Sequence, residues 1–306
     1  MEHIPVLLNE VIKLLNPREG DNAIDCTAGG GGHAIALAEK IGEKGKILAI
    51  DWDAESLKQL EAKIRSAHAE IADRFVFSHG NFADIEELVS RSGFPKADCI
   101  LFDLGFSSMQ IEGEGRGLSF QKDEPLDMRL DRNDSSLMTA ADILARYSAE
   151  DLEKVFREYG EERYARKIAR HIVDTRKMRP ILTTKDLVDR IAETMPERKE
   201  KVVRPKIGKI HFATRVFQAL RIEVNHELQN LEQGLDGALN VCSNGARIAA
   251  ISFHSLEDRI VKNKFRDWAK EGRCGIITKK PLVPSLQERI VNPRSRSAKL
   301  RVCEVI

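Results

Sequence analysis

Two aspartates and a run of glycines in the first third of the chain have the residue types and spacing to bind a nucleoside. Gly29 to Gly32 follow a short apolar run, Asp51 ends a second apolar run and Asp103 ends a later one. Glycines let backbone N–H groups approach a ligand at the positive end of the next helix. An acid about 20 residues further on accepts hydrogen bonds from ribose hydroxyls. The pattern predicts a nucleoside-containing ligand at the carboxyl ends of parallel strands.

The sequence allows two such ligands. Gly29-x-Gly31-x-x-Ala34 satisfies the dinucleotide fingerprint with Ala in the third place, which suits a nicotinamide-dependent oxidoreductase. S-Adenosylmethionine is the alternative, because a methyltransferase needs an acceptor pocket and residues 103–110 supply carboxylate, hydroxyl and amide groups for one. The sequence has no Tyr-x-x-x-Lys pair to handle a hydride. The methyl donor is therefore favoured, and the oxidoreductase stays open.

A second polar cluster, residues 251–258, follows a later apolar run. Ser255 with Asp258 three residues on is typical of a helix cap. We expect His254 to lie at the same edge of the sheet as Asp103, and it is therefore a candidate substrate contact.

Strand and helix patterns alternate through the first hundred residues, after a leading helix expected over 3–15. Strand–helix–strand alternation indicates a parallel sheet with right-handed crossovers. The architecture predicted is α/β, with a doubly wound, mostly parallel seven-stranded sheet. The expected strands are 22–28, 46–51, 75–78, 97–103, 247–253, 274–278 and 300–306, and the expected helices of this part are 34–41, 54–69, 84–92 and 256–269.

The alternation stops after the fourth strand. Residues 106–133 have no period and form a long loop of the kind that is usually functional. We predict that residues 113–212 form an all-helical domain inserted into a domain made of residues 1–112 and 213–306. Helices are expected over 140–147, 149–159, 161–175 and 185–195, followed by a basic loop over 198–211 and a helix over 213–235.

Positive charge is concentrated in one segment, although the whole chain carries only +1. Residues 160–221 hold 17 Lys and Arg against 8 Asp and Glu, which leaves 32 basic and 40 acidic residues elsewhere. Such a segment is a candidate for contact with a polyanion. The polar, basic residues 292–299 are a second candidate for phosphate contacts.

The cysteine pattern indicates an intracellular protein. Five cysteines form no Cys-x-x-Cys pair and three lie in apolar runs, which predicts buried thiols in a reducing cytoplasm and no metal site. No apolar stretch of 18 residues occurs, and no basic segment followed by an apolar one opens the chain. We expect neither a membrane span nor secretion.

Long motifs over almost the whole chain resemble the bacterial ribosomal RNA small-subunit methyltransferase H family, also called MraW. Two segments depart from the family pattern: Met109 stands where Pro is common, and residues 209–212 precede Ala213 where His-Pro is usual. The segments that carry the resemblance are His3 with residues 5–8, then 29–33, Asp51, 103–105 with 107–108, 115–129, 159–163, 213–215, 217–221, 251–262 and 292–297.

The resemblance implies a class I (Rossmann-like) methyltransferase that uses S-adenosylmethionine. Its substrate would be the exocyclic N4 of a cytosine in the decoding region of 16S rRNA, position 1402 in standard rRNA numbering. The donor contacts that the resemblance implies are Gly31, Gly32, His33, Asp51, Phe82, Asp103 and Gln110.

The acceptor's chemistry sets what the catalytic residues must do. A cytosine amine is a poor nucleophile, so the enzyme must align it and take up its proton, after the base has left its stack. We expect Asp103, or a hydroxyl of Ser107 or Ser108, to orient the amine, with His254 as a further candidate. The side chains predicted to hold rRNA are Arg163, Arg166, Lys167, Arg170, Lys201, Arg204, Lys206, Arg215, Arg294 and Arg296.

Three functions stay open from the sequence. An rRNA methyltransferase acting on 16S rRNA, within the 30S subunit or on naked RNA, is favoured. A nicotinamide-dependent oxidoreductase and a non-catalytic ribosome-assembly factor are the alternatives. The sequence does not fix the oligomeric state, and a homodimer is among the options.

Overall fold

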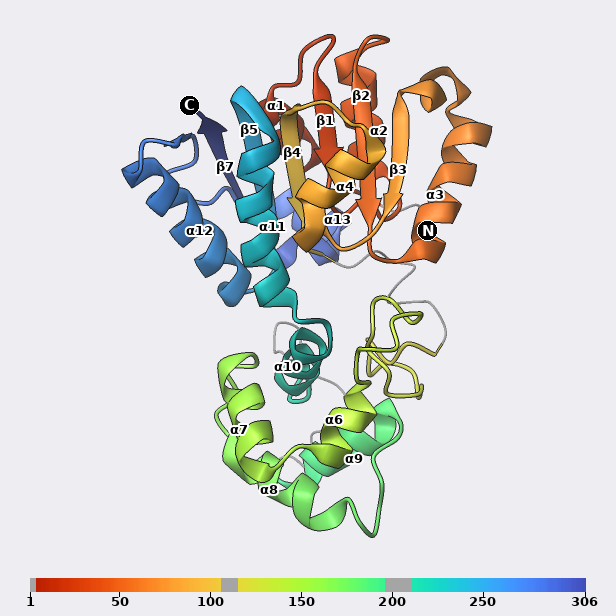
Figure 1. The fold of residues 1–306 in the computed structure, drawn as a ribbon. Helices are drawn as coiled ribbons and strands as arrows, with labels where there is room; N and C mark the ends of the chain where they lie inside the picture. Colours follow the sequence, from red (N-terminus) through yellow and green to blue (C-terminus); the bar gives the residue numbers. More distant parts are fainter. Residues whose placement is uncertain (1–3, 106–114, 196–210) are drawn as a thin grey trace. The chain divides into compact units, whose positions relative to one another are not determined.

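The computed structural model describes residues 4–105, 115–195 and 211–306 (Figure 1). The chain divides into two compact units. We call Met1–Ser107 together with Leu228–Ile306 the sheet unit, and Ser108–Glu227 the helical unit.

The sheet unit is built on a seven-stranded sheet of order β3-β2-β1-β4-β5-β7-β6. The first five strands are parallel, and β7 is antiparallel to its neighbours β5 and β6. Strand order reverses between β1 and β4, which places the expected ligand edge there. This confirms the predicted mostly parallel, doubly wound sheet. The strands are β1 (Asn22–Asp25), β2 (Lys46–Asp51), β3 (Phe75–His79), β4 (Ala97–Asp103), β5 (Cys242–Ser252), β6 (Cys274–Ile276) and β7 (Lys299–Val305).

Helices cover both faces of this sheet (Figure 1). Successive strand residues point to opposite faces, so Leu48 and Ile50 join one apolar core while Ile47 and Ala49 join the other. Residues of α4, α11 and α12 belong to the first core and residues of α1, α2 and α3 to the second. The helices are α1 (Leu8–Leu15), α2 (Gly32–Ile41), α3 (Ala54–Ala67), η1 (Ala69–Arg74), η2 (Phe82–Asp84), α4 (Ile85–Ser92), α11 (Glu227–Val241), α12 (Ser255–Lys270), α13 (Leu286–Val291) and η4 (Pro293–Ser297).

The helical unit has a core of its own. Phe156, Ile168, Leu187 and Leu220 are among its fully buried side chains. Ser/Thr-x-x-Asp capping boxes form at the starts of α6, α7 and α9. The helices are α6 (Ala140–Arg146), α7 (Ala149–Glu158), α8 (Ala165–Thr175), α9 (Thr184–Glu193) and α10 (Thr214–Asn225).

The helix expected over 213–235 is two helices, α10 and α11. His226 ends α10 in the left-handed conformation, with φ of 51°. Val216, Phe217 and Leu220 of α10 are buried in the core of the helical unit, whereas Leu231 and Leu235 of α11 are buried in the sheet unit. The boundary between the units therefore falls between Glu227 and Leu228 rather than before residue 213.

All five cysteines are free and buried, as predicted. Among the described residues, every helix is too short or too polar to cross a membrane.

Candidate functional site

The glycine run forms the turn between β1 and α2. Gly29 and Gly31 adopt positive φ values of 47° and 80°, which side-chain-bearing residues rarely adopt. The turn is tied to the sheet, because Ala28 N–H donates to the carbonyl of Ile50 at 2.8 Å. Gly31 N–H closes the turn on the carbonyl of Ala28 at 2.7 Å.

Two of the four glycines are required by packing inside the protein. A Cβ on Gly31 would lie 2.2 Å from Leu60 Cδ1, and a Cβ on Gly32 would lie 2.2 Å from Pro5 Cγ. Neither position therefore needs a ligand to explain its glycine. Donor contact through their backbones stays a prediction.

Asp51 fastens the glycine turn to the end of β2. Its Oδ2 accepts the N–H of Gly29 at 2.7 Å, and its Oδ1 accepts the N–H of Asp53 at 2.8 Å. Burial raises the pKa of Asp51 to about 6. Each carboxylate oxygen can accept a second hydrogen bond, so the chemistry fits a ribose hydroxyl, which stays a prediction.

His33 and Asp103 face each other across the ligand edge, from α2 and the end of β4. The distance from His33 Nδ1 to Asp103 Oδ2 is 3.5 Å, and His33 Nε2 lies 3.0 Å from the carbonyl oxygen of Val6. Because a carbonyl only accepts, Nε2 carries the hydrogen and Nδ1 of the neutral ring is an acceptor facing Asp103. The ring of His33 is 5% exposed, so any donor contact is expected through its backbone.

Burial favours the neutral forms of this pair. The pKa of Asp103 is raised to about 7, mainly by burial and also by the nearby carboxylate of Glu257, against the lowering effect of the Gly105 N–H. Burial also lowers the pKa of His33. Asp103 therefore changes its charge near neutral pH, where a group that takes up protons is most effective.

The sequence reasoning missed Asp25 and Thr27 at the end of β1. Thr27 Oγ1 accepts the N–H of Asp103 at 2.7 Å, and Asp25 Oδ1 accepts the N–H of Thr27 at 3.1 Å. Asp25 is 2% exposed, and burial raises its pKa to about 6. The signal in the sequence was that Asp25 ends β1 in the same way as Asp51 ends β2 and Asp103 ends β4.

Polar atoms without a hydrogen-bond partner gather at the ends of β4 and β5. Asp103 Oδ1 and Ser252 Oγ are two such buried side-chain atoms among the described residues, whereas His254 Nε2 lies 3.0 Å from Oε1 of Glu257. Asp103 pairs in register with Ile251, the residue before Ser252. Buried polar groups normally have partners, so this edge fits a polar ligand.

His254 is the N-cap residue of α12, where Ser255 was expected. Its Nδ1 accepts the N–H of Glu257 at 3.4 Å, and Glu257 Oε2 accepts the N–H of His254 at 3.2 Å. Ser255 is the first helical residue. Asp258, which was expected to pair with Ser255, forms an ion pair with Arg301, and its Oδ1 lies 2.7 Å from Nε of the arginine. His254 as a substrate contact stays a prediction.

Phe82 lies in η2, after β3. Its ring meets that of Phe102 edge to face, with centroids 5.5 Å apart. Gly234 of α11 packs against it, since a Cβ there would lie 2.6 Å from Phe82 Cδ2. Phe82 is thus held half-buried at the sheet, and its donor contact stays a prediction.

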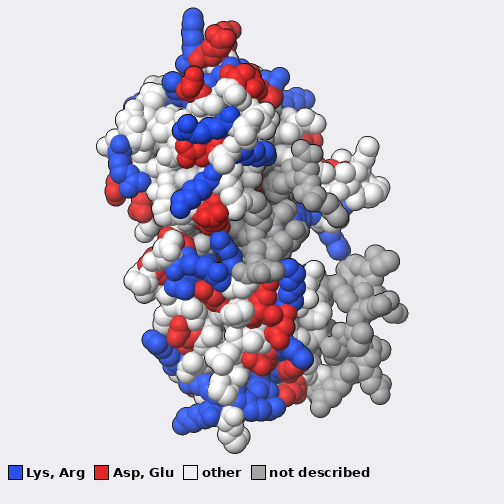
Figure 2. All heavy atoms as spheres, turned by 90° about the vertical axis from the view of Figure 1, so that its right-hand side faces the viewer, with Lys and Arg blue, Asp and Glu red and all other residues white. Residues whose placement is uncertain are grey.

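Four of the predicted RNA-binding side chains line one hollow of about 480 Å³ that runs along α8: Arg163, Arg166, Lys167 and Arg170. Arg215 instead donates to the carbonyl of Glu161 at 3.0 Å. Arg294 and Arg296 lie on η4 of the sheet unit. Figure 2 shows Lys and Arg side chains gathered at the lower end of the helical unit. Outside the described residues lie Ser107, Ser108, Gln110, Lys201, Arg204 and Lys206.

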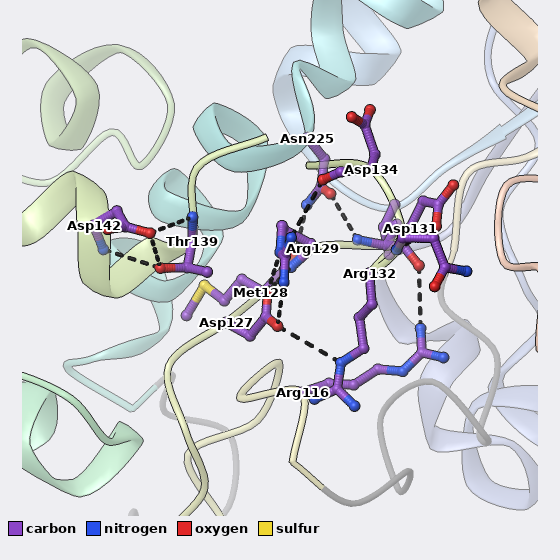
Figure 3. A network of polar contacts seen from close by, with 12 residues as sticks. Arg116, Asp127, Met128, Arg129, Asp131, Arg132, Asp134, Thr139, Asp142 and Asn225 are labelled. Carbon is purple, nitrogen blue, oxygen red and sulfur yellow. Dashed lines mark hydrogen bonds and ion pairs between the residues drawn. The ribbon is translucent and has the colours of Figure 1, made fainter. Parts of the chain in front are cut away.

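A polar network folds the long loop of the helical unit back on itself (Figure 3). Arg129 binds Asp127 through two nitrogens, at 2.7 and 3.1 Å. The fully buried Asn225 of α10 donates to the carbonyl of Met128 and accepts the N–H of Leu130, both at 2.8 Å. Met128 has a positive φ of 65°. Residues 127–130, near the end of a motif singled out in the sequence, are therefore fixed in one conformation.

Comparison with known proteins gives matches over the full length. The chain matches the MraW methylase family over residues 1–306. Three relatives are named ribosomal RNA small subunit methyltransferase H. That of Desulfosudis oleivorans is 42% identical and aligned over 99% of both chains. Those of Caldicellulosiruptor bescii and Trichlorobacter lovleyi are 44% and 43% identical, over 100% and 99% of this chain and 99% and 97% of theirs. A solved structure described as a putative rRNA methylase from Clostridium thermocellum overlaps with a TM-score of 0.43 at 14% identity, over 99% of both chains.

Proposed function

Because the chain belongs to the MraW methylase family, we propose that it transfers a methyl group from S-adenosylmethionine to N4 of a cytosine in 16S rRNA. The proposed position is 1402 of the decoding region in standard rRNA numbering. The observation that carries this proposal beyond the family match is Asp103. Its buried Oδ1 has no hydrogen-bond partner among the described residues, and it lies at the sheet edge where ligands of doubly wound folds bind.

The strand-end carboxylates fit the methyl donor. When bound, S-adenosylmethionine supplies a methyl group on a positively charged sulfur. Asp25, Asp51 and Asp103 end three adjacent strands and place negative potential at this edge when ionised. Asp51 would accept the ribose hydroxyls, and the N–H groups of Gly32 and His33 would meet the donor's carboxylate. Gly31, whose N–H is bound to the carbonyl of Ala28, would lie against the donor through the rest of its backbone. Phe82 and Gln110 complete the proposed set of contacts.

Asp103 is proposed to orient the cytosine amine and take up its proton. A carboxylate accepts a hydrogen bond from the exocyclic N–H, which aligns the nitrogen for attack on the methyl carbon. As the new nitrogen–carbon bond forms and the carbon–sulfur bond breaks, the amine proton passes to the carboxylate. Ser107 or Ser108 would assist in orienting the amine. Since only the ionised carboxyl accepts a proton, turnover should rise with pH through about 7.

The helical unit is proposed to hold the rRNA. Arg163, Arg166, Lys167 and Arg170 support this role, because they are exposed cations that line one hollow. The basic residues between 201 and 206 and those at 215, 294 and 296 are proposed to add phosphate contacts. Such binding should weaken steeply with salt, because phosphate contacts release counterions.

The test is transfer of a labelled methyl group to small-subunit RNA by the purified protein. Small subunits that lack the modification and naked 16S rRNA are each incubated with labelled S-adenosylmethionine. The RNA is then digested to nucleosides. We expect labelled N4-methylcytidine, whereas label on another atom or another base would refute the proposed acceptor.

Two measurements separate the alternatives left open by the sequence: the methyl-transfer assay and a calorimetric titration. Binding to small subunits without methyl transfer would indicate a non-catalytic assembly factor. Calorimetric titration addresses the oxidoreductase: we expect heat of binding with S-adenosylmethionine and none with NAD.

A further inference from the structure

The hollow along α8 is lined by an excess of basic side chains. Its lining includes four exposed cations, Arg163, Arg166, Lys167 and Arg170, and none of them has an acidic partner within the described part of the chain. Some other arginines of the helical unit have acidic partners, as Arg157 has in Glu153 and Arg146 has in Asp142, whereas Arg176 and Arg215 donate to carbonyl oxygens. Arg166, Lys167 and Arg170 lie on one side of α8, because residues three and four apart are neighbours on a helix surface, and Arg163 lies just before the helix.

Acids at the hollow do not neutralise these cations. Glu193 is already bound by His171 at 2.7 Å, Arg190 at 3.1 Å and Arg179 at 3.3 Å. These partners lower its pKa and keep it ionised. Asp174 is the remaining acid of the lining. The hollow therefore keeps an excess of positive charge facing solvent, which attracts an anion.

An aromatic side chain lies at the same hollow. Tyr164 is 54% exposed and is the one aromatic residue among the large exposed hydrophobic side chains of residues 4–105, 115–195 and 211–306. Buried rings stabilise a core, whereas an exposed ring between cations offers a face on which a nucleic-acid base stacks.

The backbone that carries Tyr164 is fixed before any ligand binds. The buried Glu162 accepts the N–H of Tyr164 at 2.9 Å, and its own N–H donates to the carbonyl of Phe156 at 3.0 Å. Arg215 holds the carbonyl of Glu161, and a Cβ on Gly160 would lie 2.5 Å from the carbonyl oxygen of Arg215. Little ordering is then needed on binding, which favours affinity.

We propose that this hollow binds one unpaired nucleotide of the substrate RNA, with its base stacked on Tyr164 and the adjoining phosphates on the four cations. The volume of about 480 Å³ lies within the range of pockets that hold small organic ligands. An acidic peptide would use the cations but not the ring, so the two together favour RNA. The proposal rests on the proposed function in taking RNA as the substrate, and it adds a holding site within the helical unit.

The test measures binding of a short, labelled single-stranded RNA of mixed sequence by fluorescence anisotropy over a range of salt concentrations. Tyr164→Ala should weaken binding by about 5- to 150-fold, the usual loss when one stacked base is released. Tyr164→Phe keeps the ring and should bind within about twofold of wild type. Melting curves of each variant check that the helical unit remains folded.

Salt dependence tests the cations separately. Arg166→Gln with Arg170→Gln should make the slope of log affinity against log salt shallower by about 1.4, at about 0.7 per lost phosphate contact. The control Arg146→Gln with Arg157→Gln removes two arginines that have acidic partners. It should leave the slope unchanged.

Two results would overturn the proposal. If Tyr164→Ala binds RNA as tightly as wild type, no base stacks on Tyr164. If a polyglutamate peptide displaces the RNA equally from wild type and from Tyr164→Ala, the hollow is a site for acidic peptides instead. Methyl transfer by the wild-type protein, measured in parallel, separates the two hypotheses. If the wild-type protein transfers methyl groups but the variants bind RNA as tightly as wild type, only the proposed nucleotide site is refuted. If the variants bind RNA more weakly but the wild-type protein transfers no methyl group, only the proposed enzymatic function is refuted.

Discussion

The two units of this protein hold their functional charges in opposite ways. In the sheet unit, Asp25, Asp51 and Asp103 are largely buried, and burial raises their pKa values to about 6, 6 and 7. In the helical unit, Arg166 and Arg170 are exposed and have no acidic partner among the described residues. Buried charges respond to pH and little to salt, whereas exposed charges are screened by salt.

The difference separates two tasks. A group that takes up a proton works best when its pKa lies near the working pH, which burial of Asp103 achieves. A surface that holds a long polyanion gains from permanent charges open to solvent. We therefore expect pH to act on turnover and salt to act on RNA affinity, each with little effect on the other quantity.

The largest expected loss of stability comes from the glycine turn. Gly31→Ala should lower the free energy of unfolding by about 2–6 kcal/mol, through a strained positive φ and a clash with Leu60. Gly93→Ala is the control, because Gly93 has a φ of 63° but nothing within 4 Å of an added Cβ. It should cost about 1–2 kcal/mol. Equal losses in urea unfolding would show that packing does not require Gly31.

A comparable break in the helical unit is Asn225→Ala. This change leaves the carbonyl of Met128 and the N–H of Leu130 without their buried partner. It should therefore lower the free energy of unfolding by about 2–4 kcal/mol. Asn133→Ala, at an exposed position of the same unit, should change stability by less than about 0.5 kcal/mol. Thermal unfolding measures both, and a wild-type melting temperature for Asn225→Ala would contradict the structure of the loop.

Asp103→Asn should stabilise the protein while impairing its activity. The pKa of Asp103 is about 7 in the native state against an ordinary 3.8, so the native state binds more protons than the unfolded chain between these values. Wild-type stability attributable to Asp103 therefore falls as pH rises from about 4 to 7. Asn does not titrate, so the variant should gain on the order of 4 kcal/mol over wild type above pH 8 and little at pH 4.

Unfolding at both pH values measures this gain. Asp73→Asn, at an exposed acid, is the control and should show no such trend. A difference between Asp103→Asn and wild type that stays constant with pH would mean that Asp103 does not titrate near neutrality.

The smallest expected effect concerns His254. If its main role is to cap α12, His254→Ala should cost about 1 kcal/mol and His254→Asn, which also caps, should cost little. Methyl-transfer rates of the two variants then test substrate contact. Loss of rate in both, with the stability of His254→Asn intact, would assign His254 a role in catalysis as well.

Much of the sheet unit could be predicted because its signals are local. Apolar runs bounded by Asp51 and Asp103 matched β2 and β4 to the residue. Placing these two acids at one edge followed from parallel topology alone. Side-chain partners were not predictable, since the contact of His33 with Val6 and Asp103 depends on how α2 packs against segments distant in sequence.

The break at His226 illustrates a different limit. Helical spacing of apolar residues continues from Val224 to Leu231 and Leu235, so the sequence predicts one helix. The chain turns there because the residues on either side of His226 are buried in different cores. Tertiary packing thus overrides a periodic pattern, and it moved the observed unit boundary past α10.

The central claim is that Asp103 at the end of β4 takes up the proton of the methylated amine. Its most direct test is the single-turnover rate of labelled methyl transfer to small-subunit RNA by Asp103→Ala, at saturating RNA and donor, from pH 6 to 9. We predict a rate at least about 100-fold below wild type, together with loss of the rise through pH 7 that wild type shows. A rate near wild type with the same pH dependence would contradict the account.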